Sequence, residues 1–289
     1  MEQPADAVER GGGLSFAGRS RTFGGQGHGG AAILLCAETS ALPQSPRQKP
    51  QLAEIASGKT RVIDLSYALS DKLVPWPGDA KAFEAKVNAT VEKNGYFTRS
   101  FWMLEHYGTH MDAPAHFPPG ITTVDKIPVE KFFAPAVIVD VRNEAERNPD
   151  YQLTVKRIEA WEEKHGTIPA GAIVVLRTGW ASRWPDVSRY RNQDANGTMH
   201  FPGFSVDAAK LLLERKISGL GCDTLSIDPG NSKDFPVHHA VLGAEVFQLE
   251  NLADLKDLPE AGAFLIAAPI KLEGGSGGPV RVFVLVAEK

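Results

Sequence analysis

The chain has 289 residues, 43% of them hydrophobic, which is enough to enclose a full-sized core. Its formal net charge of −4, from 31 basic and 35 acidic residues without a dense Lys/Arg block, argues against a nucleic-acid-binding protein and favours a small-molecule partner. Cys36 and Cys222 lie far apart in sequence, so neither a disulfide framework nor a thiolate zinc site is indicated. Any metal would therefore be held by nitrogen and oxygen.

Residues 1–58 form a Gly-rich and then Pro/Gln/Ser-rich segment, a composition that cannot bury enough surface to order itself. We interpret it as a disordered or removable tail. The apolar run at residues 31–37 is too short to cross a bilayer, so no transmembrane helix is expected. This run could belong to an export signal, but the segment before it is long, Gly-rich and begins with acidic residues, which fits that pattern poorly. We therefore favour a cytoplasmic over an exported protein.

The folded domain is expected over residues 59–289 and to begin with the alternating run RVIDLSY at residues 61–67, which is typical of a strand. Further strands are predicted at residues 85–92, 97–105, 136–142, 171–177, 218–223, 263–270 and 280–287. Helices are predicted at residues 154–165, 205–216 and 237–244, the first two from a Thr or Ser cap followed by apolar residues at helical spacing. Many strands with few crossover helices predict a single α/β domain with a mixed sheet and a few flanking helices.

Three of the eight histidines, His106, His110 and His116, fall within eleven residues of one another, with Asp112 among them. If the segment 106–112 is extended, side-chain alternation places His106, His110 and Asp112 on one face. Gly108 on that face would leave room for an ion and a substrate carbonyl. Two imidazoles and a carboxylate are ligands that Zn²⁺ or Mn²⁺ accept when no thiolate is at hand. His116, beyond a proline, suits proton transfer rather than ligation.

A helix is the alternative for the histidine pair, since spacing i, i+4 also aligns two side chains, as in helical zinc proteases. Asp112 would then rotate off the shared face, and Gly108 and Pro114 disfavour a helix, so we prefer a strand that runs into a loop. Any one of these histidines alone could simply be a hydrogen-bonded core or surface residue. The set as a whole favours a metal site.

A second polar group lies in DFPVHHAVLGAEVFQLENL, where His238, His239, Glu245 and Glu250 stand among apolar residues. A carboxylate buried in the strand-like VFQLENL would cost several kcal/mol, roughly, unless it met a cation or a donor network. A second metal ion would supply that partner. The alternative is an exposed Glu on an edge strand.

The string HYGTHMDAPAH resembles the HxGTHxDxPxH signature of the cyclase-like metal-dependent hydrolases, which include bacterial kynurenine formamidase and isatin hydrolase. The resemblance extends over about residues 60–288, through WPGD, GCDTLSID, PVHHAVL and LENL in the family's order. It implies an α/β fold of the swivelling β/β/α type and a homodimer or larger oligomer. It also implies a small-molecule amide substrate, either an N-formyl aryl amine or a cyclic amide.

Residue by residue, the resemblance implies one or two divalent ions, Zn²⁺ or Mn²⁺, and the following ligands: His106, His110, Asp112, His238 and Glu250. Asp112 would bridge the two ions. The twelve-residue gap to Glu250 matches the family pattern and favours His238 over His239, which stays a second choice.

The resemblance also implies His116 as the catalytic acid/base, with an ion that polarises the carbonyl and activates water. It places Trp76 in the substrate pocket, although a core or turn aromatic beside two prolines is the alternative. The insert-like residues 180–203 could cover an aromatic substrate or merely pack a surface loop.

Two other functions are alternatives to amide hydrolysis. A metal-binding protein without turnover, such as a sensor or carrier, would keep the cluster but form no product. A phosphoester hydrolase with the same ligands is disfavoured, because no Arg or Lys lies near the motif to neutralise phosphate charge.

Overall fold

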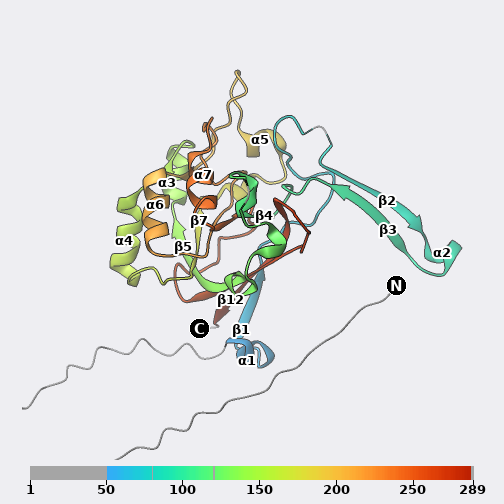
Figure 1. Ribbon diagram of the computed structural model, residues 1–289, viewed down its shortest axis with the longest axis horizontal. Coiled ribbons are helices and arrows are strands. Elements are labelled where there is room, and N and C mark those ends of the chain that lie inside the picture. Colours follow the sequence, from blue (N-terminus) through green and yellow to red (C-terminus); the bar gives the residue numbers. More distant parts are fainter. Residues whose placement is uncertain (1–50, 80, 120, 288–289) are drawn as a thin grey trace, which may run out of the picture. The chain divides into compact units, whose positions relative to one another are not determined.

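The computed structural model describes residues 51–287 with the exception of residues 80 and 120. Its centre is an eight-stranded sheet in the order β1-β12-β11-β5-β7-β9-β10-β4 (Figure 1). The strands are β1 (Thr60–Asp64), β4 (His110–Asp112), β5 (Phe133–Asp140), β7 (Ile173–Arg177), β9 (Gly219–Cys222), β10 (Phe247–Glu250), β11 (Ala263–Pro269) and β12 (Gly277–Ala287). β4 also pairs with β12, so the sheet closes on itself like a barrel.

The sheet is mixed, as predicted. β5, β7, β9 and β10 run parallel, whereas β1, β4, β11 and β12 pair with their neighbours antiparallel. Side chains alternate between two cores: Ile138 and Val175 face the barrel interior, while Val139 and Leu176 face the helices. Because both faces of β7 are buried, its sequence reads as a continuous apolar run.

Helices cover the outer face of the parallel strands (Figure 1). They are α3 (Arg142–Arg147), α4 (Val155–His165), α6 (Val206–Glu214) and α7 (Pro236–Leu242). The predicted caps are confirmed: Thr154 accepts a hydrogen bond from the amide of Arg157, and Ser205 accepts one from the amide of Ala208. The remaining helical segments are α1 (Gln51–Ala56), α2 (Val91–Asn94), α5 (Val187–Arg191), η1 (Pro114–His116), η2 (Val124–Lys126), η3 (Val129–Phe132) and η4 (Trp180–Arg183).

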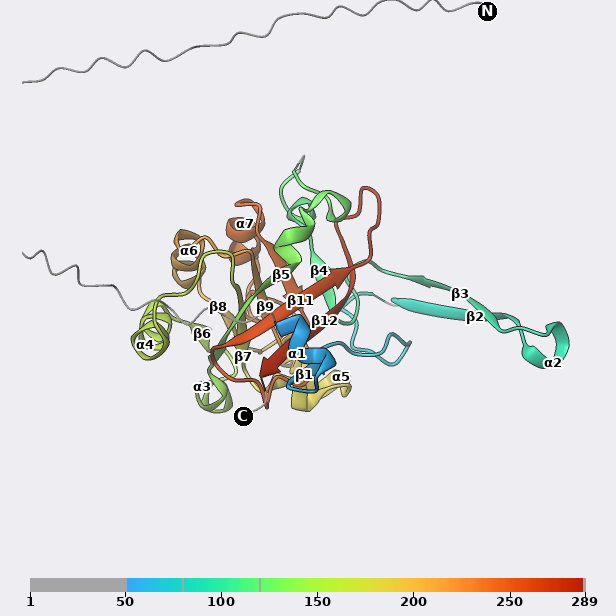
Figure 2. The same ribbon diagram turned by 90° about the horizontal axis from the view of Figure 1, so that it is seen from below.

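The predicted strands at 85–92 and 97–105 form β2 (Phe83–Ala89) and β3 (Thr98–Met103), a hairpin that constitutes a sheet of its own. Figure 2 shows this hairpin, with α2 at its tip, as an arm that projects away from the barrel. Val87 and Phe101 on the arm are 51% and 60% exposed. Another short pair, β6 (Gln152–Leu153) with β8 (Gly203–Phe204), lies near the helices.

Most of the predicted tail, residues 1–50, lies outside the described residues, and the domain boundary near residue 58 stays a prediction. Within the described part, α1 immediately precedes β1. No helix in that part has the length and apolar character needed to span a membrane.

Part of the stretch 180–203 packs into a core cluster of the fold. Trp180 and Tyr190 are 2% and 0% exposed, and Trp180 Nε1 donates a hydrogen bond to the carbonyl of Tyr190. Val74 and Leu225, which line the cavity beside His110 and His238, belong to the same cluster. This part of the stretch therefore supports the cavity wall from behind and is buried, unlike the surface loop of the second alternative.

Candidate active site

The predicted ligands meet at one cavity of about 410 Å³. His110 lines it from β4, and Glu250 lines it from β10, where it is the register partner of His110. Asp112, on the same strand as His110, lies within the cluster of these side chains. His238 comes from α7, and all four of these side chains are buried. Residues that are 140 positions apart in sequence are thus brought together by the antiparallel pairing of β10 with β4.

The expected extended conformation of residues 106–112 is wrong for its first half. Only His110–Asp112 is a strand, and His106 reaches the cluster through a bend in which Gly108 has φ = +67°. A side chain at Gly108 would be strained by that backbone angle and would meet Leu73 Cδ1 at 2.8 Å. The glycine is therefore needed for the turn as well as for the open space.

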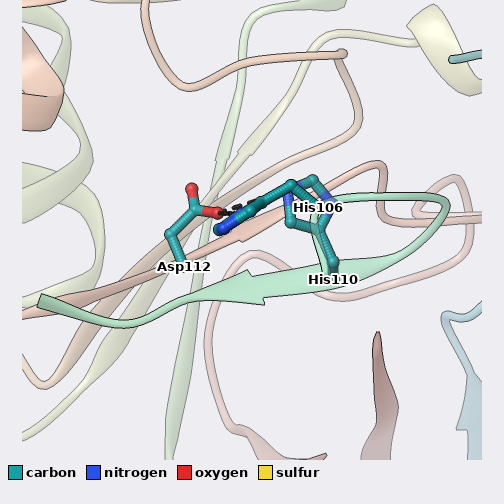
Figure 3. Close-up of side chains that lie close together, drawn as sticks. All are labelled: His106, His110 and Asp112. Atoms are coloured by element: carbon teal, nitrogen blue, oxygen red, sulfur yellow. Dashed lines mark hydrogen bonds and ion pairs between the residues drawn. The ribbon is translucent and has the colours of Figure 1, made fainter. Parts of the chain in front are cut away.

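Asp112 lies at the centre of the cluster and belongs to both groups of side chains that could hold a metal ion. Its Oδ1 lies 2.7 Å from His106 Nδ1 and 3.2 Å from His110 Nε2. Figure 3 shows the two imidazoles directed at this carboxylate. On the other side, His238 Nε2 lies 3.5 Å from Asp112 Oδ2 and 3.2 Å from Glu250 Oε1.

In His110 and His238, the ring nitrogen that faces away from the carboxylates is held by a hydrogen bond. His110 Nδ1 donates to the carbonyl of Gly108 at 3.0 Å, and His238 Nδ1 donates to Asp228 Oδ2 at 2.6 Å. In its neutral form, each ring turns an unprotonated Nε2 towards the carboxylates, whose oxygens are also acceptors. Ligating histidines in proteins are held in this way.

Asp112 Oδ2 is buried and has no hydrogen-bond partner among the described residues. An unpaired buried carboxylate oxygen is costly unless a cation faces it. Converging acceptors and this orphaned atom fit a divalent cation with nitrogen and oxygen ligands.

The charges agree with this interpretation. Burial alone would raise the pKa of Asp112, but the neighbouring His110 holds it well below its usual value. Burial alone would lower the pKa of His110, but Asp112 raises it to about 9. The carboxylates therefore create a strong preference for positive charge at this point.

His116 stands beside the cluster and does not belong to either ligand group. Its ring stacks on the His106 ring with 3.8 Å between centroids, and it lines the cavity. Burial lowers the pKa of His116 to about 4, so the ring is neutral at neutral pH. His239 is exposed and does not line the cavity, so it is the weaker choice beside His238.

Glu250 is buried on an interior strand between β9 and β4, which excludes the exposed edge-strand alternative. Glu245 is only half-buried and does not line the cavity.

The upper wall of the cavity is aromatic. Trp76 lines it, as the resemblance implied, and faces Phe235 with 5.9 Å between ring centroids. Phe117 lines the same wall, with 5.6 Å between its ring centroid and that of Phe235. Sequence reasoning missed both phenylalanines, although each lies next to a motif that it had singled out.

Sequence reasoning also missed the role of Asp228. This carboxylate accepts hydrogen bonds from the amides of Val237 and His238 and from the His238 ring. It caps the start of α7, where the N-cap residue Phe235 supplies no side-chain bond. The segment GCDTLSID had drawn attention by resemblance alone, without a reason for its aspartates.

The family model described as "Putative cyclase" matches residues 63–229, more than half of the chain. This chain belongs to the Cyclase family. The α/β fold expected from the resemblance is confirmed as well.

Among the relatives of this Cyclase-family chain, isatin hydrolase of Roseibium aggregatum is 36% identical over 81% of the chain and 95% of its own length. Kynurenine formamidase of Bacillus thuringiensis is 30% identical over 77% of the chain and 96% of its own length. The solved structure of isatin hydrolase A from Ralstonia solanacearum superposes with a TM-score of 0.75 at 38% identity, covering 85% of this chain and 100% of that one.

Proposed function

We propose that the chain is a metal-dependent hydrolase that cleaves the amide C–N bond of a small aromatic substrate. The observation that carries this proposal is the cluster of acceptors around Asp112 at the base of a cavity with aromatic walls. The similarity to isatin hydrolase and kynurenine formamidase supports it.

His106, His110 and Asp112 would hold one divalent ion, and Asp112, His238 and Glu250 a second. We propose Zn²⁺ or Mn²⁺, since nitrogen and carboxylate ligands suit both. When bound, such an ion supplies Lewis-acid polarisation of the amide carbonyl and activates water near neutral pH.

The chain's own side chains supply binding and proton transfer. Trp76, Phe117 and Phe235 would hold an aromatic ring against the cavity wall and exclude bulk water from the scissile bond. A ring nitrogen of His116 would take a proton from the attacking water and deliver it to the departing nitrogen, a contribution of about 10²- to 10⁴-fold.

The charge of the cavity favours a cyclic amide of the isatin type over formylkynurenine. Among the described residues that line it there is no Arg or Lys, and Asp79 adds a negative charge. Formylkynurenine is an amino acid, and its carboxylate would find no cationic side chain among these residues and would face Asp79. Isatin is a flat, neutral molecule that needs no such partner.

Turnover of the two amides tests this proposal. Metal-loaded protein, and the same protein stripped with a chelator, would be incubated with isatin and with formylkynurenine, while ring opening and formate release are followed. We expect metal-dependent ring opening of isatin at a higher kcat/KM than formate release. Tight binding of both amides without product would instead indicate a carrier protein.

We further propose that the chain forms a homodimer through the β2–β3 arm. One face of the arm carries Phe83, Ala85, Val87, Phe101 and Met103, which pair across the two strands or alternate along them. A solitary two-stranded hairpin is marginal in water, and an exposed apolar stripe marks an interaction surface. In a two-fold dimer each arm would cover the body of the other subunit, so the same contact between arm and body would form twice.

A further inference from the structure

His106 differs from the other two histidines of the cluster in what holds its outer nitrogen. Its Nε2 lies 2.8 Å from the hydroxyl of Ser276, which is 170 residues away in sequence. Ser276 in turn contacts Glu105, the residue before His106: its hydroxyl donates to Glu105 Oε2 at 2.7 Å and its amide at 2.8 Å. The three side chains form a continuous chain of hydrogen bonds.

The direction of these bonds follows from the donors that are present. The carboxylate of Glu105 can only accept, so the single hydroxyl proton of Ser276 is directed to it. The oxygen of Ser276 is then an acceptor towards His106, whose Nε2 must carry the proton. In its neutral form, the ring therefore presents an unprotonated Nδ1 to Asp112 Oδ1 at 2.7 Å. Two acceptors come this close favourably only if a cation lies with them.

The backbone is arranged for this contact. Ser276 precedes Gly277, the register partner of Asp112 in the pairing of β12 with β4. A side chain at Gly277 would lie 2.5 Å from His106 Cε1 and 2.4 Å from the carbonyl of Met111. Only glycine lets the β12 strand approach closely enough for Ser276 to reach His106.

We propose that Glu105 and Ser276 are positioning residues that fix the tautomer and orientation of His106 for the ion held by His106, His110 and Asp112. This inference rests on the proposed function, because it requires that an ion binds there. In this proposal the outer nitrogen of His106 donates to the hydroxyl of Ser276, which donates in turn to Glu105. The outer nitrogens of His110 and His238 instead donate directly to the Gly108 carbonyl and to Asp228. Loss of such an outer partner lowers metal affinity by about 10- to 100-fold.

The test compares Ser276→Ala, which removes the hydroxyl, with Ser276→Thr, which keeps it, and with Ser188→Ala at an exposed serine on α5. Zn²⁺ affinity and stoichiometry would be measured by competition with a chelating dye, without any substrate. In Zn²⁺-loaded protein with ¹⁵N-labelled histidine, NMR reports which ring nitrogen of His106 carries the proton.

We expect wild type, Ser276→Thr and Ser188→Ala to bind Zn²⁺ alike and to show His106 protonated on Nε2. Ser276→Ala should lose about 10- to 100-fold in affinity at one site and leave any second site, which does not involve His106, unchanged. If Ser276→Ala binds like wild type and shows the same tautomer, the positioning role is overturned while the proposed function stands. If wild type itself takes up no ion, the proposed function fails, and this inference fails with it.

Discussion

The Asp112 cluster and the β2–β3 arm depart from ordinary protein surfaces in opposite ways. The cluster buries charge: Asp112 is 1% exposed and His238 and Glu250 are 4% and 5% exposed. The arm exposes apolar side chains, with Phe101 60% exposed. Buried polar groups and exposed apolar patches are the informative exceptions to the usual distribution of residues. Our proposals assign a divalent ion to the first region and a second subunit to the other.

Loss of the shared carboxylate should have the largest effect. In Asp112→Asn both ion sites lose their common ligand, so activity should fall by more than the about 100-fold that an outer partner can cost. Elemental analysis should show that both ions are lost. Asp257→Asn, at an exposed position, is the matched control and should keep metal and activity. Retention of metal by Asp112→Asn would break the assignment of this residue as the bridge.

Removal of His116 should separate chemistry from metal binding. We expect His116→Ala to lower kcat by about 10²- to 10⁴-fold while its metal content stays at the wild-type value. His239→Ala, a change at an exposed histidine of the same region, should retain kcat. If metal is lost together with His116, this ring is a ligand and the division of roles within the cluster is wrong.

The arm can be tested by placing charge on its apolar face. If the proposed homodimer forms, Phe101→Asp should convert it into a monomer, because the carboxylate would be buried without a partner in the interface. Ser100→Asp places the same charge on the opposite face of β3 and should leave the dimer intact. The molar mass of each variant, measured by size-exclusion chromatography with light scattering, shows whether it is a monomer or a dimer. A monomeric wild type would contradict the homodimer.

The smallest effect on stability is expected from His200 and Asp150, a partly exposed ion pair that lies outside both regions. The hydrogen bond of His200 to Asp150 raises the pKa of His200 in the folded chain. The resulting stability is fully present below the unfolded pKa of about 6.5 and is lost as the pH rises through the higher folded value. Because both side chains are partly exposed, less than about 1 kcal/mol is at stake.

Urea unfolding would measure this effect as the difference in unfolding free energy between pH 5.5 and pH 8.5, for wild type and Asp150→Asn. The pH-dependent part assigned to His200 should disappear in the variant. An unchanged pH dependence would show that the pair contributes nothing.

The sequence predicted the features that depend on local chemistry. The caps at Thr154 and Ser205 and the helices after them follow from spacing and side-chain type alone. The side chains of the cluster could also be named from the sequence, because residue type determines which atoms can hold an ion. The strand that ends at Asp112 was predicted, but only its last three residues are extended.

What could not be predicted depends on contacts between distant segments. Nothing in the neighbourhood of His106 reveals that Ser276 holds its outer nitrogen, since the two meet only when β12 pairs with β4. Closure of the sheet and separation of the arm likewise depend on pairing partners rather than on the strands' own sequences. The positive φ of Gly108 gives residues 106–109 a bent backbone instead of the expected strand. The side chain of His106 nevertheless lies in the cluster, as predicted.

Anomalous X-ray diffraction from crystals soaked in Zn²⁺, recorded on both sides of the zinc absorption edge, tests the central claim most directly. The account predicts an anomalous peak among Asp112, His110 and His106, and a second one beside His238 and Glu250 if two ions bind. Fully occupied zinc elsewhere on the molecule, with no anomalous density at Asp112, would contradict it.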